Sequence, residues 1–539
     1  MKIKLSVLFI AMACFAPVAA FCQTTADPIV AGKTIAVVNT DNGQLRGYIH
    51  NSIYTYKGIP YATAERFMAP AKPKAWQGIR SSMSYGPVCP TDATTTVNDE
   101  GEFPFHHDWG YTNENCQTLN VWTPRINDGK KRPVMVWFHG GGFTAGSSVE
   151  LPSYDGESLA RKGDVVMVSV NHRLNILGFL DLSAYGDKYK SSANAGLIDL
   201  VAALQWVKEN IAQFGGDPDN VTIFGQSGGG GKVSCLMAAP SAKGLFHKAI
   251  VESGSYVTAF TEKTTAQKIG AALLEVLNLQ ASQVDSLQKM PYERLCAAGK
   301  KAIKKVADQM RAEGKGGGAF GLGWNAVLDG DFLPYQPSDQ AAMDLAKNVP
   351  LVVGSTKNEF APFIPGSNEK TLVQVKLDLQ KRYGDKAKDY MAAVEKAYPG
   401  TVDAADYVNI DFNFRQLAIK QANMKAVPGA APVYMYLFAW QSPVNDGKYK
   451  AMHCMELPFV FNNVKRCEEM TGGGKDALAL ADKMSGAWIN FAKTGNPNAP
   501  GLPKWPAYSA ENGATMIFNI KNEVRSHPDE DLLKIAGGK

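Results

Sequence analysis

The stretch VTIFGQSGG (residues 221–229) places a serine, Ser227, between two glycines at the end of an apolar, β-branched run. A helical pattern follows at once in GGKVSCLMAAP (230–240). Strand, tight turn and helix are the context in which G-x-S-x-G forms a nucleophile elbow, which exposes the serine hydroxyl. An ordinary glycine-rich turn is the alternative. The glycines favour the elbow, because so sharp a turn leaves no room for Cβ atoms two residues to either side.

Similar apolar runs alternate with helical patterns along the rest of the chain. We expect strands in TLNVWTP (118–124), VMVWFHG (134–140), VVMVSVNHR (165–173), VTIFGQS (221–227), KAIVESGS (248–255), LVVGST (351–356), VYMYLFAW (433–440) and MIFNI (516–520). Several have no polar alternation, as is typical of strands buried on both faces. The pattern predicts an α/β fold with a large, mostly parallel central sheet and helices on both faces.

Three segments depart from this alternation. IAVVNT (35–40) and GQLRGYI (43–49) flank Asp41-Asn42 and predict an antiparallel hairpin. Residues 256–346 and 357–431 are mainly helical. In an α/β enzyme, such insertions usually cover the active site above the strand ends.

Composition and charge exclude several classes of protein. The chain has 539 residues, of which 45% are hydrophobic, and its 9 Trp, 20 Tyr and 24 Phe exclude a disordered protein. The net charge is only +5. The densest basic cluster has the i, i+4 spacing of a solvated helix face and comprises Lys300, Lys301, Lys304 and Lys305. We therefore expect no nucleic-acid partner.

The first residues have the features of an export signal. Lys2 and Lys4 precede an apolar run from Leu5 to Ala20, and cleavage after Ala20 or Cys22 fits the rule for small residues. A lipoprotein acylated at Cys22 is the alternative, but a bulky phenylalanine precedes that cysteine. No later stretch has the 18 consecutive apolar residues of a membrane span. We expect a signal peptide at 1–22, a single catalytic domain at 23–539, and a periplasmic or extracellular location.

A second glycine motif supplies candidate hydrogen-bond donors. WFHGGGF (137–143) follows a predicted strand and matches the HGGG-type loop. The backbone N–H groups of Gly141, Gly142 and Gly228 could point at one tetrahedral oxygen. Losing one such donor typically lowers the rate by about 10²–10³.

The candidate base follows from chain order. A nucleophile elbow is followed by the acid and then by the histidine, and only His247, His453 and His527 follow Ser227. His247 precedes the next strand and His527 lies in the polar tail. His453 occupies the loop after the strongly apolar strand 433–440, so it is the predicted base.

The acid that orients His453 must lie between the serine and this histidine. Glu359 comes a few residues after the predicted strand 351–356, so it emerges at a strand end. Asp329 and Asp331 precede that strand in a turn, and Asp411 lies in helical surroundings. Glu359 is the predicted acid.

Six cysteines remain once the predicted signal peptide is removed, and they allow 15 pairings. They are Cys89, Cys116, Cys235, Cys296, Cys454 and Cys467. Cys89 and Cys116 flank a polar, aromatic loop and are the stronger candidate pair, whereas Cys454 and Cys467 are a weaker one. Cys235 lies in an apolar helical stretch, which favours a buried thiol.

Several motifs together resemble the type-B carboxylesterase family. FGGDPDNVTIFGQSGG (214–229) fits its serine signature, and ENCQTLNVW (114–122) resembles its second signature. Other landmarks are NHRLNILGFL (171–180), GSTKNEF (354–360), MHCMELPFVF (452–461) and FAKTGNPN (491–498). The resemblance implies an α/β-hydrolase fold, a triad of Ser227, Glu359 and His453, and an oxyanion hole of Gly141, Gly142 and Gly228. It also implies that Cys89 and Cys116 form the family's first disulfide.

Four residues depart from the family pattern. Gln226 stands where glutamate is usual, Asn115 and Gln117 replace aspartate and leucine in the second signature, and Phe360 stands where glycine is common. Gln226 removes a charge beside the histidine, and the pair in the second signature would alter a buried polar network. None of these changes removes a catalytic atom.

The resemblance implies a serine carboxylesterase that hydrolyses small-molecule esters through an acyl-enzyme intermediate. We expect no cofactor and no metal site, since the sequence has no HExxH or CxxC motif. A non-catalytic adhesion module on the same fold is one alternative. A lipase- or thioesterase-type substrate is the other, because pocket residues come from variable insertions.

Overall fold

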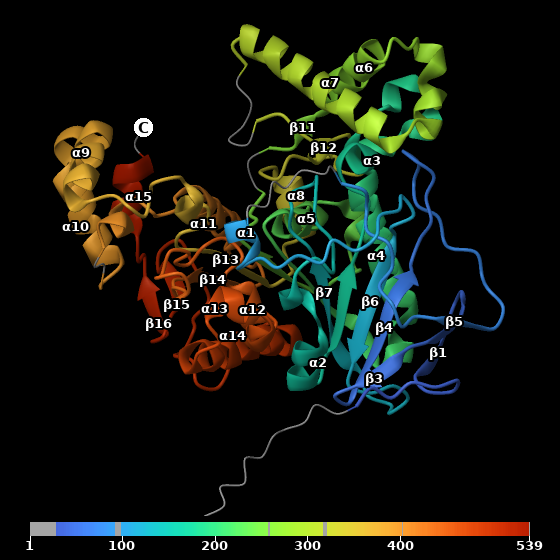
Figure 1. Ribbon diagram of the computed structural model, residues 1–539, viewed down its shortest axis with the longest axis horizontal. Coiled ribbons are helices and arrows are strands. Elements are labelled where there is room, and N and C mark those ends of the chain that lie inside the picture. The colour runs from blue at the N-terminus through green and yellow to red at the C-terminus, as the bar shows by residue number, and fades with distance from the viewer. Residues whose placement is uncertain (1–27, 92–98, 257–258, 316–320, 401–402, 538–539) are drawn as a thin grey trace, which may run out of the picture.

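The computed structural model describes residues 28–91, 99–256, 259–315, 321–400 and 403–537 (Figure 1). The predicted signal peptide at 1–22 lies outside the described residues.

A large sheet forms the centre of the molecule. Within the described residues it has eleven strands, in the order β16-β15-β14-β13-β10-β9-β7-β8-β6-β4-β3. They are β3 (Tyr48–His50), β4 (Ile53–Pro60), β6 (Thr118–Thr123), β7 (Arg132–Phe138), β8 (Val166–Val170), β9 (Gly216–Gln226), β10 (Lys248–Glu252), β13 (Leu351–Thr356), β14 (Val433–Phe438), β15 (Ala514–Phe518) and β16 (Glu523–Ser526). In this order, every pair from β15 to β8 is parallel, and antiparallel pairs occur only at the two edges.

The predicted α/β fold is confirmed, and each of the eight predicted strand runs overlaps a strand of this sheet. The apolar pattern does not reveal β4, because polar residues and Gly58 interrupt it. The predicted hairpin is present as β1 (Val37–Thr40) and β2 (Gly43–Arg46), which form a separate small sheet with β5 (Ile79–Ser81). The run 43–49 is divided at Gly47, after which β3 joins the large sheet.

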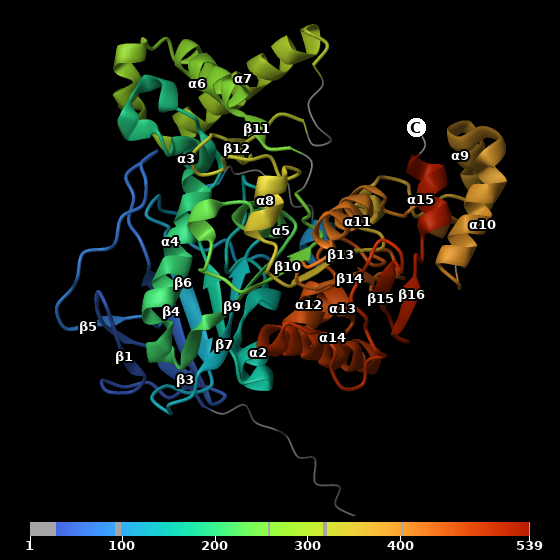
Figure 2. The same cartoon turned by 180° about the vertical axis from the view of Figure 1, so that it is seen from behind.

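Alternate side chains of the central strands enter two different cores. On β7, Val134, Val136 and Phe138 face one core, whereas Met135 and Trp137 face the other. This alternation follows from the period of two in a strand, and both faces are apolar because helices cover both. The first core is covered by α4 (Ala195–Asn210), α5 (Gly228–Met237) and α11 (Asn413–Lys425), and the second by α2 (Glu157–Gly163), α12 (Leu457–Val460) and α14 (Lys475–Thr494) (Figures 1 and 2).

The two insertions lie apart from each other (Figure 1). The first contains α6 (Lys263–Val276), α7 (Tyr292–Ala312), α8 (Gln340–Leu345) and the short strands β11 (Thr261–Glu262) and β12 (Val327–Leu328). The second contains α9 (Leu372–Tyr383) and α10 (Ala387–Ala397), and α10 packs on the C-terminal helix α15 (Glu530–Gly537). It continues into α11, which packs on β13 and β14 beside the site described below.

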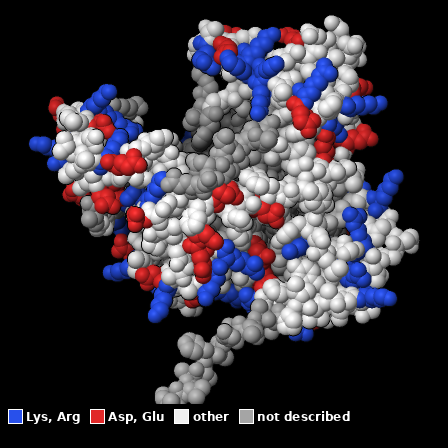
Figure 3. All heavy atoms as spheres, viewed as in Figure 1, with Lys and Arg blue, Asp and Glu red and all other residues white. Residues whose placement is uncertain are grey.

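The basic cluster predicted on a helix face lies on α7 and is exposed. Lys304 pairs with Asp308, and Lys305 pairs with Glu275 of the neighbouring helix. Lys and Arg are interspersed with Asp and Glu over the face in Figure 3. None of the described helices has both the length and the hydropathy of a membrane span.

Candidate active site

Ser227 occupies a strained turn between β9 and α5. Its backbone angles are φ 55° and ψ −125°, which a non-glycine residue rarely adopts. The Ser227 N–H donates to the carbonyl of Glu252 (2.8 Å), and the Ser227 carbonyl accepts from Gly231 N–H (3.0 Å). A Cβ atom on Gly229 would lie 1.9 Å from the carbonyl oxygen of Phe138. The strand–turn–helix motif and its glycines therefore form an elbow that presents the serine side chain.

The glycine loop after β7 lies directly against this elbow. Gly141 and Gly142 have φ values of 79° and 61°, in the region that favours glycine. A Cβ atom on Gly228 would lie 2.3 Å from the carbonyl oxygen of Gly142. Among the described residues, the N–H groups of Gly141, Gly142 and Gly228 have no protein acceptor. Three free donors and the positive end of α5 thus surround Ser227.

Glu359 and His453 are brought together by neighbouring parallel strands. Glu359 follows β13, His453 follows β14, and Glu359 Oε2 contacts His453 Nδ1. The His453 N–H also donates to the Glu359 carbonyl (2.9 Å). The second carboxylate oxygen of Glu359 accepts from Ser253 Oγ (2.6 Å) and from Thr356 N–H (2.8 Å). Both carboxylate oxygens are occupied, so the imidazole is held in one orientation.

Gln226 connects the elbow to the imidazole. Its Nε2 lies 3.2 Å from Nε2 of His453, and its Oε1 accepts from Cys454 Sγ (3.2 Å). Within the described part of the chain, the Ser227 hydroxyl makes no hydrogen bond, to His453 or to any other group. Such bonds are often long without substrate and tighten when it binds. The Gln226 contact places His453 beside the elbow.

Two aromatic rings flank the imidazole. The ring centroid of Phe360 lies 4.2 Å from that of His453, and the centroid of Phe414 lies 5.3 Å from it. Phe360 is half exposed, at 50%. The departure at residue 360 therefore adds an apolar wall against one side of the His453 imidazole.

Buried carboxyl groups near Glu359 carry less negative charge around neutral pH than exposed carboxyl groups do. Burial raises the pKa of Glu252 to about 8. Burial and the charge of Glu359 raise the pKa of Asp411 to about 7 and that of Glu456 well above its usual range. Glu252 and Glu456 are therefore mainly protonated near neutral pH, and Asp411 is partly protonated.

The other candidate bases make contacts elsewhere. His247 Nδ1 accepts from Val221 N–H (3.1 Å), and His527 Nε2 contacts the carbonyl oxygen of Glu511 (3.0 Å). Neither contacts the Glu359–His453 pair.

The other candidate acids are likewise occupied. Asp329 accepts from Asn194 Nδ2 (2.8 Å) and from Asp331 N–H (3.0 Å) within its own turn. Asp411 lies near Glu359, but its carboxylate accepts from Arg415 N–H (3.1 Å) at the start of α11.

The sequence analysis did not identify Ser253 or Phe414 as site residues. Ser253 comes directly after β10 and has a φ of 44°. Its position at a strand end was a usable signal, because the carboxyl ends of parallel strands meet at one edge. No sequence pattern indicated Phe414, because this residue reaches the site only through the packing of α11.

The two changes in the second signature differ in their surroundings. Gln117 is buried, and its Nε2 lies 3.5 Å from Asp199, which pairs with Arg173. Asn115 is exposed. The predicted effect on a buried polar network therefore applies to Gln117 alone.

The described cysteines are all free thiols. Cys89 and Cys116 are buried beside each other, and burial together with a hydrogen bond from Cys89 raises the pKa of the Cys116 thiol well above its usual range. The predicted bond between them is not formed in this structure.

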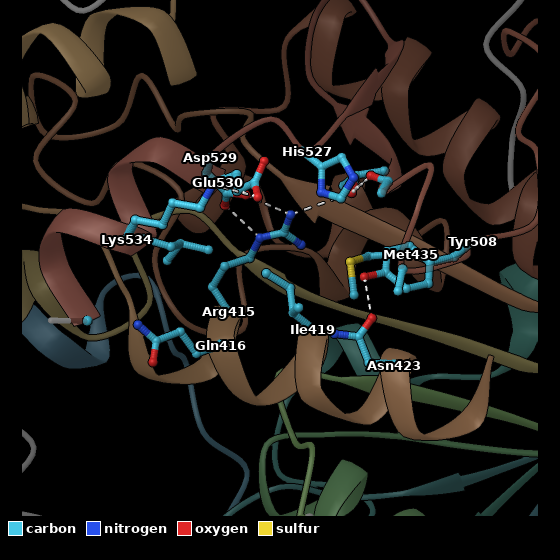
Figure 4. A pocket seen from close by; sticks show the side chains of 15 residues that line it. Arg415, Gln416, Ile419, Asn423, Met435, Tyr508, His527, Asp529, Glu530 and Lys534 are labelled. Carbon is cyan, nitrogen blue, oxygen red and sulfur yellow. Dashed lines mark hydrogen bonds and ion pairs between the residues drawn. The ribbon is translucent and has the colours of Figure 1, made fainter. Parts of the chain in front are cut away.

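A pocket of about 560 Å³ lies between α11 and α15 (Figure 4). Arg415 and Asp529 point toward each other there and form two hydrogen bonds of 2.6 and 3.0 Å. Phe414, not Arg415, contacts the imidazole. This pocket is therefore separate from the site around Ser227.

The described residues contain no group of His, Cys, Asp or Glu side chains arranged to hold a metal ion. A mostly parallel sheet, a serine elbow, and an acid and a histidine after later strands define the α/β-hydrolase fold.

Comparisons with known proteins define the family. The profile described as Carboxylesterase family matches residues 34–535. Para-nitrobenzyl esterase of Bacillus subtilis (strain 168) is 37% identical over 92% of this chain and 98% of its own. Phenmedipham hydrolase of Pseudarthrobacter oxydans is 32% identical over 90% of this chain and 95% of its own. The chain therefore belongs to the carboxylesterase family, and it is a carboxylic ester hydrolase.

Solved structures agree with this assignment. An esterase from anaerobic Clostridium hathewayi, described as able to hydrolyse aliphatic aromatic polyesters, has a TM-score of 0.85 and 38% identity, and the match covers 95% of this chain and 100% of that one. A para-nitrobenzyl esterase structure has a TM-score of 0.74 and 35% identity over 93% of this chain and 99% of that one. These relatives are named as ester-hydrolysing enzymes, which supports an ester hydrolase over the alternative of a non-catalytic adhesion module.

Proposed function

We propose that this ester hydrolase works through an acyl-enzyme intermediate on Ser227. Ser227 Oγ attacks the ester carbonyl carbon, and His453 takes the hydroxyl proton as the new C–O bond forms. The carbonyl electron pair becomes an oxyanion that accepts from the N–H groups of Gly141, Gly142 and Gly228. His453 then returns the proton to the departing alkoxide. Water attacks the acyl-enzyme in the same way, with His453 again as the base, and the acid is released from Ser227.

The contact between Glu359 and His453 beside the elbow is the observation that carries this proposal. Glu359 fixes the imidazole tautomer in which Nδ1 carries the proton, so Nε2 has the lone pair and can act as base once the substrate complex draws it from the Gln226 amide to the serine hydroxyl. A carboxylate held at both oxygens, by Ser253 and by Thr356 N–H, stabilises the imidazolium that forms.

Labelling with a fluorophosphonate tests the proposal. The reagent phosphonylates an activated serine, and mass spectrometry of the digest should find the label on the peptide that contains Ser227. Ser227→Ala should lose both labelling and ester turnover while it keeps the wild-type melting temperature. Ser234→Ala is a matched control, because Ser234 lies on the same helix and donates to the Gly230 carbonyl (3.0 Å). Equal labelling of Ser227→Ala, or label on another serine, would refute the mechanism.

For substrates, we propose small-molecule esters with an activated aryl or benzyl alcohol. The support is the similarity to the para-nitrobenzyl esterase, together with the apolar wall of Phe360 and Phe414 beside the base. Acetate esters of 4-nitrophenol, of 4-nitrobenzyl alcohol and of ethanol test the alcohol, and 4-nitrophenyl esters of increasing acyl length, with a matched thioester, test the acyl group. Highest kcat/KM on the shortest chains supports it, and a marked preference for long-chain esters or for thioesters would indicate the lipase- or thioesterase-type alternative.

We also propose that the chain is exported and that Cys89 and Cys116 form a disulfide in the oxidising compartment. Their burial side by side supports the pairing, and closing the ring would stabilise the fold by about 3 kcal/mol on the loop-entropy model. N-terminal sequencing of exported protein should find a new terminus after Ala20 or Cys22. Mapping of unreduced peptides should find Cys89 joined to Cys116, and a free thiol at either would reject the pairing.

A further inference from the structure

Lys232 is a buried lysine beneath the glycine loop. It lies on α5, five residues after Ser227, and it is fully buried at 0% exposure. Its Nζ donates to the carbonyl oxygen of His139 (2.9 Å). Among the described residues, no carboxylate lies within 4.0 Å of this amine. A buried cationic side chain with one acceptor is costly, so a lysine here calls for a functional explanation.

The carbonyl that Lys232 holds belongs to the oxyanion loop. His139 directly precedes Gly140, whose own carbonyl shares a peptide unit with the N–H of Gly141. The His139 carbonyl also lies beside the elbow, since a Cβ atom on Gly229 would be 2.9 Å from it. Lys232 therefore fixes the loop at the peptide unit directly before the one that carries the N–H of Gly141, the first free donor.

The ionisable groups that face Lys232 come from several elements. They are Glu150, His139, His172, Cys89 and Cys235. Burial and then the charge of Lys232 lower the pKa of both histidines well below the usual range, so both are neutral. Burial raises the pKa of the Cys235 thiol beyond its usual range. Glu150 is the one facing carboxylate, and it accepts from Tyr154 Oη (3.4 Å).

We propose that Lys232 is a positioning residue for the oxyanion loop. It holds the loop through the His139 carbonyl, and its ammonium group adds positive charge on the side of the loop that faces the protein interior. This inference rests on the proposed acyl-enzyme mechanism. The effect appears only when the carbonyl oxygen becomes negative, so it acts on the transition state and not on substrate binding.

The charge beneath the loop depends on pH. Burial lowers the pKa of Lys232 to about 7 and raises that of Glu150 to about 7. As the pH rises through the neutral range, the pair loses protons and the local charge becomes less positive. Oxyanion stabilisation therefore weakens on the alkaline side.

Two variants separate the hydrogen bond from the charge. Lys232→Gln keeps a donor for the His139 carbonyl without a charge, and Lys232→Met removes both. We expect Lys232→Met to lower kcat by about 10- to 100-fold, since a small misplacement of the loop is enough for such a loss. KM should change less than threefold, and Lys232→Gln should recover part of the loss. Lys232→Gln should also show a smaller alkaline fall in kcat than we expect for wild type, because only Glu150 then loses a proton beneath the loop.

A transition-state analogue provides the decisive readout. When Ser227 adds to an aryl trifluoromethyl ketone, its proton passes to His453 and the carbonyl electron pair becomes an anionic oxygen in the oxyanion hole. The inhibition constant of this ketone should rise in Lys232→Met by the same factor as kcat falls. Unchanged kcat and unchanged inhibition in Lys232→Met would overturn the proposal, as would an equal change in KM and kcat.

Controls distinguish this proposal from loss of folding and from failure of the mechanism. Lys425 is also a buried lysine that donates to a backbone carbonyl, that of Lys347 (2.9 Å), and Lys425→Met should leave kcat within twofold. Lys232→Met should melt no lower than wild type, because folding no longer buries the amine. Fluorophosphonate labelling of Ser227 is measured first. If the wild-type protein is labelled on Ser227 and Lys232→Met keeps the wild-type kcat, only the inference about Lys232 is refuted. If the wild-type protein is not labelled on Ser227, the acyl-enzyme mechanism itself is refuted.

Discussion

The side-chain amide of Gln226 lies against the imidazole of His453, with its Nε2 3.2 Å from His453 Nε2 and 3.4 Å from Nδ1. Residue 226 therefore does more than pack beneath the turn. Its amide is neutral, whereas the family usually has a carboxylate there. The electrostatics of the base in this chain thus differ from those of a typical relative.

We predict that Gln226→Glu moves the acidic limb of the kcat/KM profile to higher pH. A carboxylate within about 4–6 Å stabilises the protonated imidazole, so the base stays protonated to higher pH. We expect a shift of a few tenths to about one unit. The measurement is a pH–rate profile of both proteins on 4-nitrophenyl acetate.

A second variant, Gln226→Met, controls for packing. It removes the amide contacts with His453 and Cys454 but introduces no charge, so its acidic limb should move less than that of Gln226→Glu even if its stability falls. An unmoved limb in Gln226→Glu, or a limb moved to lower pH, contradicts the electrostatic account.

The second prediction concerns the hydroxyl that supports the acid. Ser253 Oγ donates to Glu359 Oε1 (2.6 Å), and a hydrogen bond to a charged group contributes about 1.5–3 kcal/mol. Ser253→Ala should lower kcat by about tenfold or more, since about 1.4 kcal/mol corresponds to a factor of ten. KM should change little, because the carboxylate acts mainly as the imidazolium forms.

Ser255→Ala is the matched control. Its hydroxyl is also buried and follows the same strand, but among the described residues it has no hydrogen-bond partner. Wild-type kcat in both variants would show that Ser253 does not position Glu359.

Sequence reasoning identified the elbow and the strand-end residues because local rules dictate them. A G-x-S-x-G between a strand and a helix is the context of a nucleophile elbow, and residues after parallel strands collect at one edge of the sheet. Glu359 and His453 were therefore within reach of the sequence, although 94 residues separate them.

The rest of the site depends on packing that no local pattern encodes. Phe414 reaches the imidazole only because α11 packs on β13 and β14. Lys232 has the sequence context of an ordinary helical lysine, and only the fold shows that its amine meets the His139 carbonyl. In the same way, β4 is hidden by its polar residues, since its order comes from pairing with β6.

The third prediction uses the glycines that follow Ser227. A Cβ atom on Gly229 would meet the Phe138 carbonyl at 1.9 Å, whereas a Cβ atom on Gly231 has its nearest neighbour at 3.7 Å. Gly229→Ala should therefore be destabilised by about 3 kcal/mol or more, because a backbone carbonyl cannot yield. Gly231→Ala should be neutral or up to about 1 kcal/mol more stable, because alanine favours the helix interior.

Urea denaturation of both variants tests this comparison. If Gly229→Ala is as stable and as active as Gly231→Ala, then β7 and α5 are not as closely packed at the elbow as the structure has them.

The fourth prediction concerns Asp411, the acid beside Glu359. Burial and the charge of Glu359 raise its pKa to about 7, compared with an ordinary value near 4. Between these values the folded protein holds a proton that the unfolded chain has released. The free energy of unfolding therefore falls as pH rises through this window, by up to about 1.4 kcal/mol per pH unit for one proton.

Asp411→Asn should abolish this part of the pH dependence. The amide oxygen can still accept from the Arg415 N–H at the start of α11, and no proton is released at any pH in the window. Wild type and variant should be about equally stable near pH 4, and the variant should be more stable at pH 8. Denaturant titrations at pH 4, 6 and 8 measure the difference. Asp529→Asn is a contrasting control, because Asp529 pairs with Arg415 and its loss should destabilise the fold at pH 8. A constant difference between Asp411→Asn and wild type across the three pH values would mean that Asp411 is already ionised in the folded protein, and that Glu359 has a charged neighbour after all.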